Sequence, residues 1–193
     1  MHALRTVVAA AVLAAVGAFW APAARAQEQP KPIRLYLGAF FPTNSDTKDA
    51  IGDTEFSWGL SYDIPQKKPL PAVIAVYFDG VWASGDSIGG LDVDFHYLGI
   101  GPMARYYLGK KGEADAAQKS RFYVGGGFGM YWITAQIVDN AGFYVSTLDN
   151  DIKFGGKLVG GLEFGKSFLV EGDYTWPGSS KGNGWNFRAG FRF

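Results

Sequence analysis

The sequence has no cysteine and little histidine, and it lacks an excess of charge of either sign. Its 193 residues include two His, and 18 Lys and Arg balance 18 Asp and Glu. An exported chain without Cys is not a disulfide scaffold, so another device must hold it together. A formal net charge of zero argues against a general nucleic-acid binder. We expect no nucleic-acid partner and no cofactor.

Long apolar runs are also scarce, with one exception at the start of the chain. His2 and Arg5 precede an apolar stretch over residues 7–20, and Ala24-Arg25-Ala26 follows it. This order is typical of a cleaved secretory signal peptide. We therefore expect a signal peptide over residues 1–26 and one mature domain over residues 27–193. The mature part has no second apolar run long enough for a spanning helix.

Aromatic residues (16%) and 27 glycines dominate what remains, and they follow a period of two. In the last segment Trp185, Phe187, Ala189, Phe191 and Phe193 share one face, opposite Asn186, Arg188, Gly190 and Arg192. Such alternation predicts β-strands. We expect eight strands at about residues 32–41, 54–64, 72–82, 91–108, 121–133, 151–164, 167–176 and 183–193. The fold class is all-β.

The alternation by itself fits both a soluble sandwich and a membrane barrel. Three features favour the barrel. Aromatic residues such as Trp58, Tyr106, Trp132 and Trp176 lie toward the ends of the apolar faces, as in interfacial girdles. The other face mixes charges with Gly, which suits a narrow lumen, and each segment has the length of a tilted spanning strand. We predict an eight-stranded antiparallel up-and-down transmembrane β-barrel.

An even strand number places both ends of the barrel chain on the periplasmic side. Outer loops are then expected near residues 42–53, 83–90, 134–150 and 177–182, and inner turns near 65–71, 109–120 and 165–166. The fourth strand is irregular, because Phe95 and Val93 break the parity set by Leu98 to Leu108. A β-bulge near Tyr97 is expected to reconcile the two halves.

The signal peptide, the alternating strands and a last strand NFRAGFRF ending on Phe193 resemble the small outer-membrane β-barrel superfamily of the OmpA/OmpX type. The resemblance covers the whole mature chain and implies an outer-membrane location. It implies that Phe187, Phe191 and Phe193 form the signal read by the barrel assembly machinery, with periplasmic chaperones as further partners during biogenesis. The superfamily includes structural barrels, narrow pores, adhesins and lipid A enzymes, so the fold does not give the function.

Charged residues on the inward faces are the main candidate site. A buried charge is costly unless it is paired, so a dry lumen requires matched signs. We expect Arg188 near Glu171 or Asp173, and Arg34 near Asp63 at the inner end. The set can be a structural plug, which we favour, or a gate on a narrow ion path. By parity its members are Arg34, Arg105, Lys153, Lys157, Arg188 and Arg192, facing Glu55, Asp63, Asp79, Glu163, Glu171 and Asp173.

Two further motifs are weaker. Residues 160–167 match the phosphate-binding pattern G-x-x-x-x-G-K-S, but Ser167 opens a strand rather than the helix that such a loop needs. His96 follows Asp92 and Asp94, and with Ser84 or Ser87 across a hairpin it could serve a metal site or a hydrolase. A solvated hairpin rim is the expected reading, so we predict no metal site and no catalytic residue.

The leading functional hypothesis is a non-enzymatic barrel with a structural envelope role or a very narrow passage for small solutes. The alternatives are a lipid A-modifying hydrolase using His96, and an adhesin acting through the loop at 134–150. Within that loop, residues 141–145 (AGFYV) form either an exposed contact surface or a strand extension. The expected surroundings are outer-membrane lipid and lipopolysaccharide, with the protein as a monomer.

Overall fold

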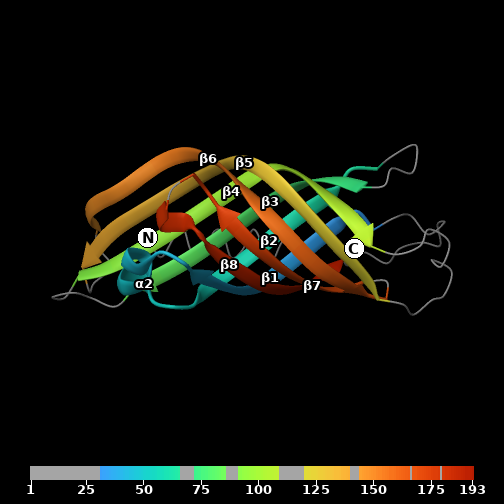
Figure 1. Cartoon of the computed structure of the whole chain (residues 1–193). Helices are drawn as coiled ribbons and strands as arrows, with labels where there is room; N and C mark the ends of the chain where they lie inside the picture. The colour runs from blue at the N-terminus through green and yellow to red at the C-terminus, as the bar shows by residue number, and fades with distance from the viewer. Residues whose placement is uncertain are drawn as a thin grey trace.

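The computed structural model describes residues 31–65, 72–85, 91–108, 120–139, 144–165, 167–178 and 180–193. The expected signal peptide lies outside these residues. The described part of the chain forms one closed antiparallel barrel (Figure 1). Its strands are β1 (Ile33–Pro42), β2 (Glu55–Asp63), β3 (Ala72–Gly85), β4 (Leu91–Leu108), β5 (Arg121–Asp139), β6 (Tyr144–Phe164), β7 (Phe168–Trp176) and β8 (Gly184–Arg192). The predicted eight-stranded all-β barrel is therefore confirmed.

The barrel closes because β1 pairs with β2 on one side and with β8 on the other. Each strand pairs with its sequence neighbours, which is the up-and-down order. Ile33 and Phe193 exchange backbone hydrogen bonds of 3.2 and 2.8 Å where β1 begins and β8 ends. We call this the inner end and the opposite one the outer end, following the usual orientation of outer-membrane barrels.

The expected bulge near Tyr97 is wrong. The register of β4 against β3 continues without a shift from Val93 to Tyr106. Phe95, Tyr97 and Met103 all point inward and are buried. The register shifts lie instead between β5 and β6, at Ala135/Gln136 and Ile137/Val138.

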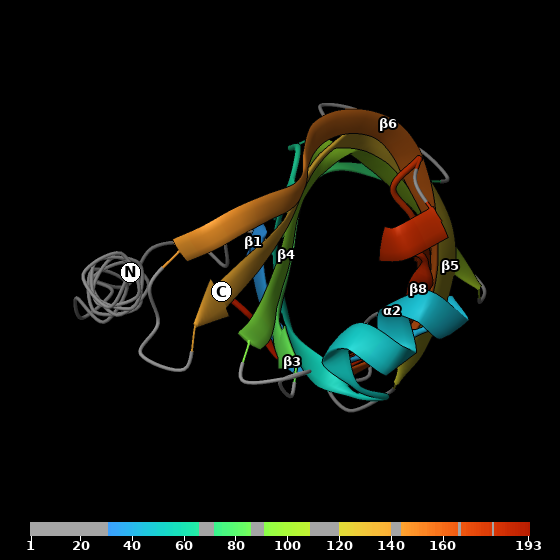
Figure 2. The same cartoon turned by 90° about the vertical axis from the view of Figure 1, so that its left-hand side faces the viewer.

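A short helix occupies part of the first expected outer loop. Helix α2 (Ser45–Ile51) begins after Asn44, whose side-chain oxygen accepts a hydrogen bond of 3.1 Å from the Thr47 amide. Gly52 ends it with a φ of 99°, a conformation that favours glycine. Ile51 is 4% exposed and packs into the barrel core. The helix lies at the outer mouth beside the 3-10 turn η1 (Ser180–Gly182), and the Thr47 hydroxyl donates a hydrogen bond of 2.9 Å to the Lys181 carbonyl (Figure 2).

Strand extends into two other expected outer loops. β3 continues to Gly85, and the region expected as a loop at 134–150 consists of strand up to Asp139 and again from Tyr144. β5 and β6 have 19 and 21 residues, against 9 residues in β7 and in β8. The β5–β6 hairpin therefore projects beyond the outer mouth (Figure 2). Tyr144 and Val145 fit the strand-extension reading, while residues 141–143 lie outside the described part.

The barrel is apolar outside and polar inside, the reverse of a soluble domain. Leu37, Phe154 and Phe187 are exposed by 51%, 77% and 57%. Arg34, Arg105 and several Tyr are almost completely buried in the interior. Such an exterior needs lipid around it.

No helix among the described residues is long and apolar enough to cross a membrane.

Glycines make room for the large inward side chains. Along one inward row the register pairs Tyr36 with Gly59, Gly59 with Asp79, Asp79 with Gly99, and Gly99 with Tyr131. A Cβ atom on Gly99 would lie 2.5 Å from the Tyr131 ring. Small and large residues thus alternate around the wall, which lets a narrow barrel be filled without voids.

Candidate functional site

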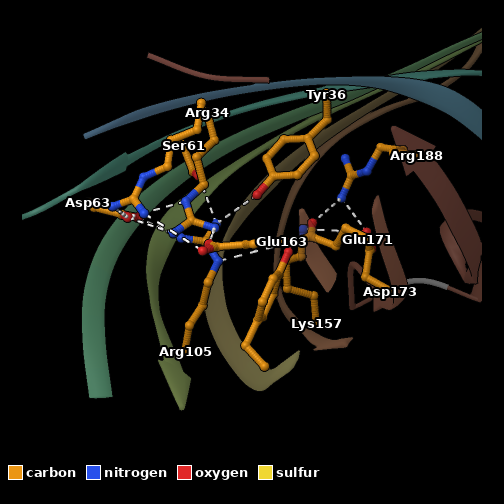
Figure 3. Close-up of polar contacts among 12 residues, drawn as sticks. Arg34, Tyr36, Ser61, Asp63, Arg105, Lys157, Glu163, Glu171, Asp173 and Arg188 are labelled. Atoms are coloured by element: carbon orange, nitrogen blue, oxygen red, sulfur yellow. Dashed lines mark hydrogen bonds and ion pairs between the residues drawn. The ribbon is translucent and has the colours of Figure 1, made fainter. Parts of the chain in front are cut away.

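The buried charged side chains form two clusters at different depths along the barrel axis. The inner cluster consists of Arg34, Asp63, Arg105, Glu163 and Arg192. The middle cluster consists of Asp79, Lys157, Glu171, Asp173 and Arg188. Figure 3 shows Arg34, Asp63 and Arg105 of the inner cluster beside Glu171, Asp173 and Arg188 of the middle cluster.

In the inner cluster two carboxylates are shared among several arginines. Arg34 and Arg105 each approach Asp63 at 2.8 Å, through different carboxylate oxygens. Arg34 also lies 2.6 Å from Glu163, and Arg192 lies 3.3 Å from Asp63. Sharing of this kind satisfies the oxygens of both carboxylates in a site from which water is largely excluded.

Polar side chains that the sequence analysis did not single out complete the inner cluster. Tyr107 accepts a hydrogen bond of 2.6 Å from Arg34 and donates one of 2.7 Å to Glu163. Ser61 accepts one of 2.7 Å from Arg105. Arg121, half exposed at the inner mouth, lies 2.6 Å from Glu163. Inward parity on each strand is the signal that identifies all of these residues.

In the middle cluster Arg188 contacts three carboxylates. Its guanidinium lies 3.0 Å from Asp79 and 3.3 Å from Glu171, and it pairs with Asp173. Lys157 lies 2.5 Å from Asp79. The middle cluster has more anions than cations and the inner cluster more cations than anions. An Arg105 to Glu171 distance of 4.0 Å links the two, so their charges offset one another.

Two residues of the expected charge set do not join the clusters. Lys153 lies 2.6 Å from Asp151, and both side chains are substantially exposed. Lys153 pairs with Tyr131 in the register, beyond the point where β7 begins to pair with β6 at Gly156. Its parity is inward, but the wall that would enclose it is missing at that height. Glu55, the first residue of β2, is only partly buried and takes no part in either cluster as described.

The outer part of the interior is apolar. Ile51, Val81, Phe95 and Ile133 are buried together with Phe40, beneath α2. Phe40 packs edge to face on Tyr97, with ring centroids 5.7 Å apart. The lumen therefore contains an ionic zone toward the inner end and an apolar zone toward the outer end.

His96 and its neighbours lie on the outward wall, not in the lumen. The register pairs Trp82 with His96 and Ser84 with Asp94. The Ser84 hydroxyl donates a hydrogen bond of 2.7 Å to Asp94, so in the described part of the chain it is not directed at His96. A hydrolase triad requires the hydroxyl to bond the imidazole. Of Asp92 only the strand position is described, and Ser87 lies outside the described residues.

The residues of the other sequence motifs lie outside the two charged clusters. Ser167 precedes β7 and no helix follows it, so the local structure differs from a phosphate-binding loop. Phe187, Phe191 and Phe193 face outward with 57%, 54% and 40% exposure. Among the residues that the structure describes, no group of three or more His, Cys, Asp or Glu could hold a metal ion.

No family model matches the sequence, and no curated protein is detectably similar to it. Among solved structures the chain is similar to Ail, the attachment invasion locus protein of Yersinia pestis, in a complex with the heparin analogue sucrose octasulfate. That likeness has 14% identity and a TM-score of 0.48, and it covers 84% of this chain and 97% of that chain. Similarity to the outer membrane enzyme PagL has 11% identity and a TM-score of 0.46, covering 83% and 98%. At identities this low, the functions of Ail and PagL cannot be assigned to this chain.

A closed barrel of eight antiparallel strands with an apolar exterior and an ionic interior is an integral β-barrel of the outer membrane. Its eight strands in up-and-down order are the smallest number found in bacterial outer-membrane barrels. Its place in the cell is the outer membrane, where strands rather than helices span the bilayer.

Proposed function

We propose that this protein is a closed, non-enzymatic barrel with a structural role in the outer membrane. The observation that carries the proposal is that polar contacts cross the lumen. Asn186 on β8 and Tyr97 on β4 lie four strands apart around the barrel, yet their polar atoms are 3.5 Å apart. Lys157 on β6 reaches Asp79 on β3 at 2.5 Å. Contacts of this kind obstruct the passage of water along the axis.

The apolar zone beneath α2 supports the same proposal. The buried apolar side chains of this zone, which include Phe40, Ile51, Phe95 and Ile133, disfavour water between them. Passage of ions would then require both the ion pairs and this zone to open. A structural role is therefore better supported than a narrow conducting path.

Planar-bilayer recordings of the refolded protein test the proposal. We expect no conductance steps from the native chain. We also expect none from a variant that combines Arg188→Ala with Glu171→Ala, because the apolar zone remains. Regular steps from the native protein would refute the closed barrel, and steps from the double variant alone would identify a gate.

Absence of catalysis is tested on the membrane itself. Ser84 is hydrogen bonded to Asp94, a geometry that gives little support to a nucleophile activated by His96. We expect identical lipid A mass spectra from cells that express the native chain and cells that express His96→Ala. A lipid A species that is lost in the variant would establish the hydrolase instead.

The projecting β5–β6 hairpin supports a second candidate function, contact with a partner outside the cell. The hairpin extends past the mouth while β7 and β8 end at it. Shortening residues 137–147 to a tight turn should abolish any surface binding by this protein and leave the barrel folded. A matched control replaces residues 86–90, between β3 and β4, with a turn of the same length.

A further inference from the structure

The outward wall of β3, β4 and β5 changes character toward the outer end. One outward row, read across the register, runs Gly80, Leu98, Trp132 and Ile152. The next row outward runs Trp82, His96, Thr134 and Asn150. The row beyond that runs Ser84, Asp94 and Gln136. The wall thus passes from apolar to polar within two rows.

This change marks the edge of the hydrocarbon layer on that wall. Leu98 and Ile152 suit contact with acyl chains, whereas a carboxylate, a hydroxyl and an amide do not. Tryptophan rings prefer the boundary between the two layers, and both Trp82 and Trp132 lie there. The polar rows therefore lie at the depth of the headgroups of the outer leaflet.

The polar rows have the composition of a site for sugar hydroxyls. Asp94 is only 5% exposed and is positioned by the Ser84 hydroxyl at 2.7 Å. Trp132 is 53% exposed, and its indole N–H donates a hydrogen bond of 2.7 Å to Asn150, which fixes the ring against the wall. Hydroxyl and amide groups both accept hydrogen bonds from sugar hydroxyls and donate to them, and an aromatic ring offers an apolar face against which a sugar ring can pack.

The charge of the patch distinguishes among headgroups. Its rows contain neither Lys nor Arg, and their one carboxylate, Asp94, would repel a phosphate. Phosphate sites in proteins rely on cations or on aligned backbone N–H groups. A phospholipid headgroup is therefore a poor fit, and a glycan headgroup a good one.

We propose that the outward patch of Ser84, Asp94, His96, Trp132, Thr134 and Gln136 binds the sugar headgroup of a glycolipid in the outer leaflet. The patch lies on the outer surface of the wall and does not depend on whether the lumen is closed. The exposed Ser84 hydroxyl, held by Asp94, and the Gln136 amide form hydrogen bonds with sugar hydroxyls, and the Trp132 ring packs against the sugar face.

The test uses the refolded mature chain in nanodiscs of phosphatidylcholine that contain digalactosyl diacylglycerol and phosphatidylglycerol in equal minor amounts. Native mass spectrometry of the released protein gives the ratio of the two lipids retained. We expect the glycolipid to be enriched over its share of the bilayer. Ser84→Ala should lower the enrichment about fivefold, the equivalent of one neutral hydrogen bond, and Trp132→Ala should also lower it.

Trp185→Ala is the matched control, because Trp185 is an outward Trp of similar exposure, 47%, on β8. It should leave the enrichment unchanged. Heat-modifiable gel migration establishes that each variant is folded, and Gln136→Ala replaces Ser84→Ala if the latter does not fold. The proposal fails if phosphatidylglycerol is retained equally well, if the patch variants match the native chain, or if Trp185→Ala is as damaging as they are.

Discussion

Adding one methyl group at Gly161 should destabilise the barrel strongly, while the same change at Gly160 should not. Gly161 points inward between Tyr123 and Glu171 in the register, and the Tyr123 ring crosses it to donate a hydrogen bond of 2.8 Å to Glu171. A Cβ atom on Gly161 would lie 2.4 Å from both Cζ and Oη of Tyr123. On Gly160, which points outward, the nearest heavy atom would be 3.9 Å away.

The magnitude follows from the two consequences of moving the Tyr123 ring. Overpacking a filled interior costs about 1 to 3 kcal/mol, and loss of the hydrogen bond to a charged acceptor costs about 1.5 to 3 kcal/mol more. We therefore expect Gly161→Ala to lower the free energy of unfolding by about 2.5 to 6 kcal/mol. Gly160→Ala should change it by less than about 1 kcal/mol, because it adds no clash and reduces the entropy of the unfolded chain.

Urea unfolding of the refolded protein in phospholipid vesicles, followed by tryptophan fluorescence, measures both changes. Combining Gly161→Ala with Tyr123→Leu should cost less than the sum of the two single changes, because the second substitution removes the ring that the methyl group strikes. Equal stability of Gly160→Ala and Gly161→Ala would refute the inward packing described for this row. Full additivity in the double variant would show that the cost arises elsewhere.

Three further predictions concern the ion clusters, the outer helix and assembly. Arg188→Met should lower the free energy of unfolding by about 3 to 5 kcal/mol, since it leaves Asp79 and Asp173 with Lys157 and leaves Glu171 with Arg105 at 4.0 Å; a smaller loss when Glu171→Gln is added would establish the coupling. Asn44→Ala should destabilise α2 by about 1 kcal/mol, which hydrogen exchange over residues 45–51 would report while the barrel amides stay protected. Phe193→Ala, which keeps the backbone hydrogen bonds with Ile33, should reduce the amount of barrel assembled in cells but not the stability of the refolded protein; equal assembly would contradict the expected signal.

Much of the lumen could be predicted because the side-chain period of a strand is two. Once a strand is recognised, its alternate residues are assigned to the interior, and antiparallel pairing brings neighbours together. Arg188 and Glu171 are direct partners in the β7–β8 register, which two strands joined by a short connection make readable. Arg34 and Asp63 meet near the inner end for the same reason.

Strand alternation does not predict features that depend on the position of a residue along the barrel axis or on contacts across the lumen. Parity places Lys153 inward, but whether a neighbouring strand encloses it depends on the unequal lengths of β6 and β7. Helix α2 has seven residues, too few for a helical period to show, and its position over the mouth comes from Ile51 packing into the core. Contacts across the lumen, such as Asn186 with Tyr97, depend on the barrel diameter and not on sequence spacing.

The irregular fourth strand is the most instructive case, because its pattern has a different cause from the expected bulge. Along β4 the outward residues change from Ile100 and Leu98 to His96 and Asp94, while the inward residues become apolar at Phe95. A local bulge would alter one strand and its register. Instead the neighbouring strand β5 changes in the same row.

In β5 the outward side passes from Trp132 to Thr134 and Gln136, while Ile133 and Ala135 are buried on the inward side. His96 and Thr134 are register partners, so both strands change polarity at one height with continuous pairing. A change shared by neighbouring strands reflects their surroundings: hydrocarbon ends outside, and the ionic zone gives way to the apolar zone inside. An inversion of polarity along a barrel strand can therefore mark the membrane boundary, and the next strand distinguishes it from a bulge.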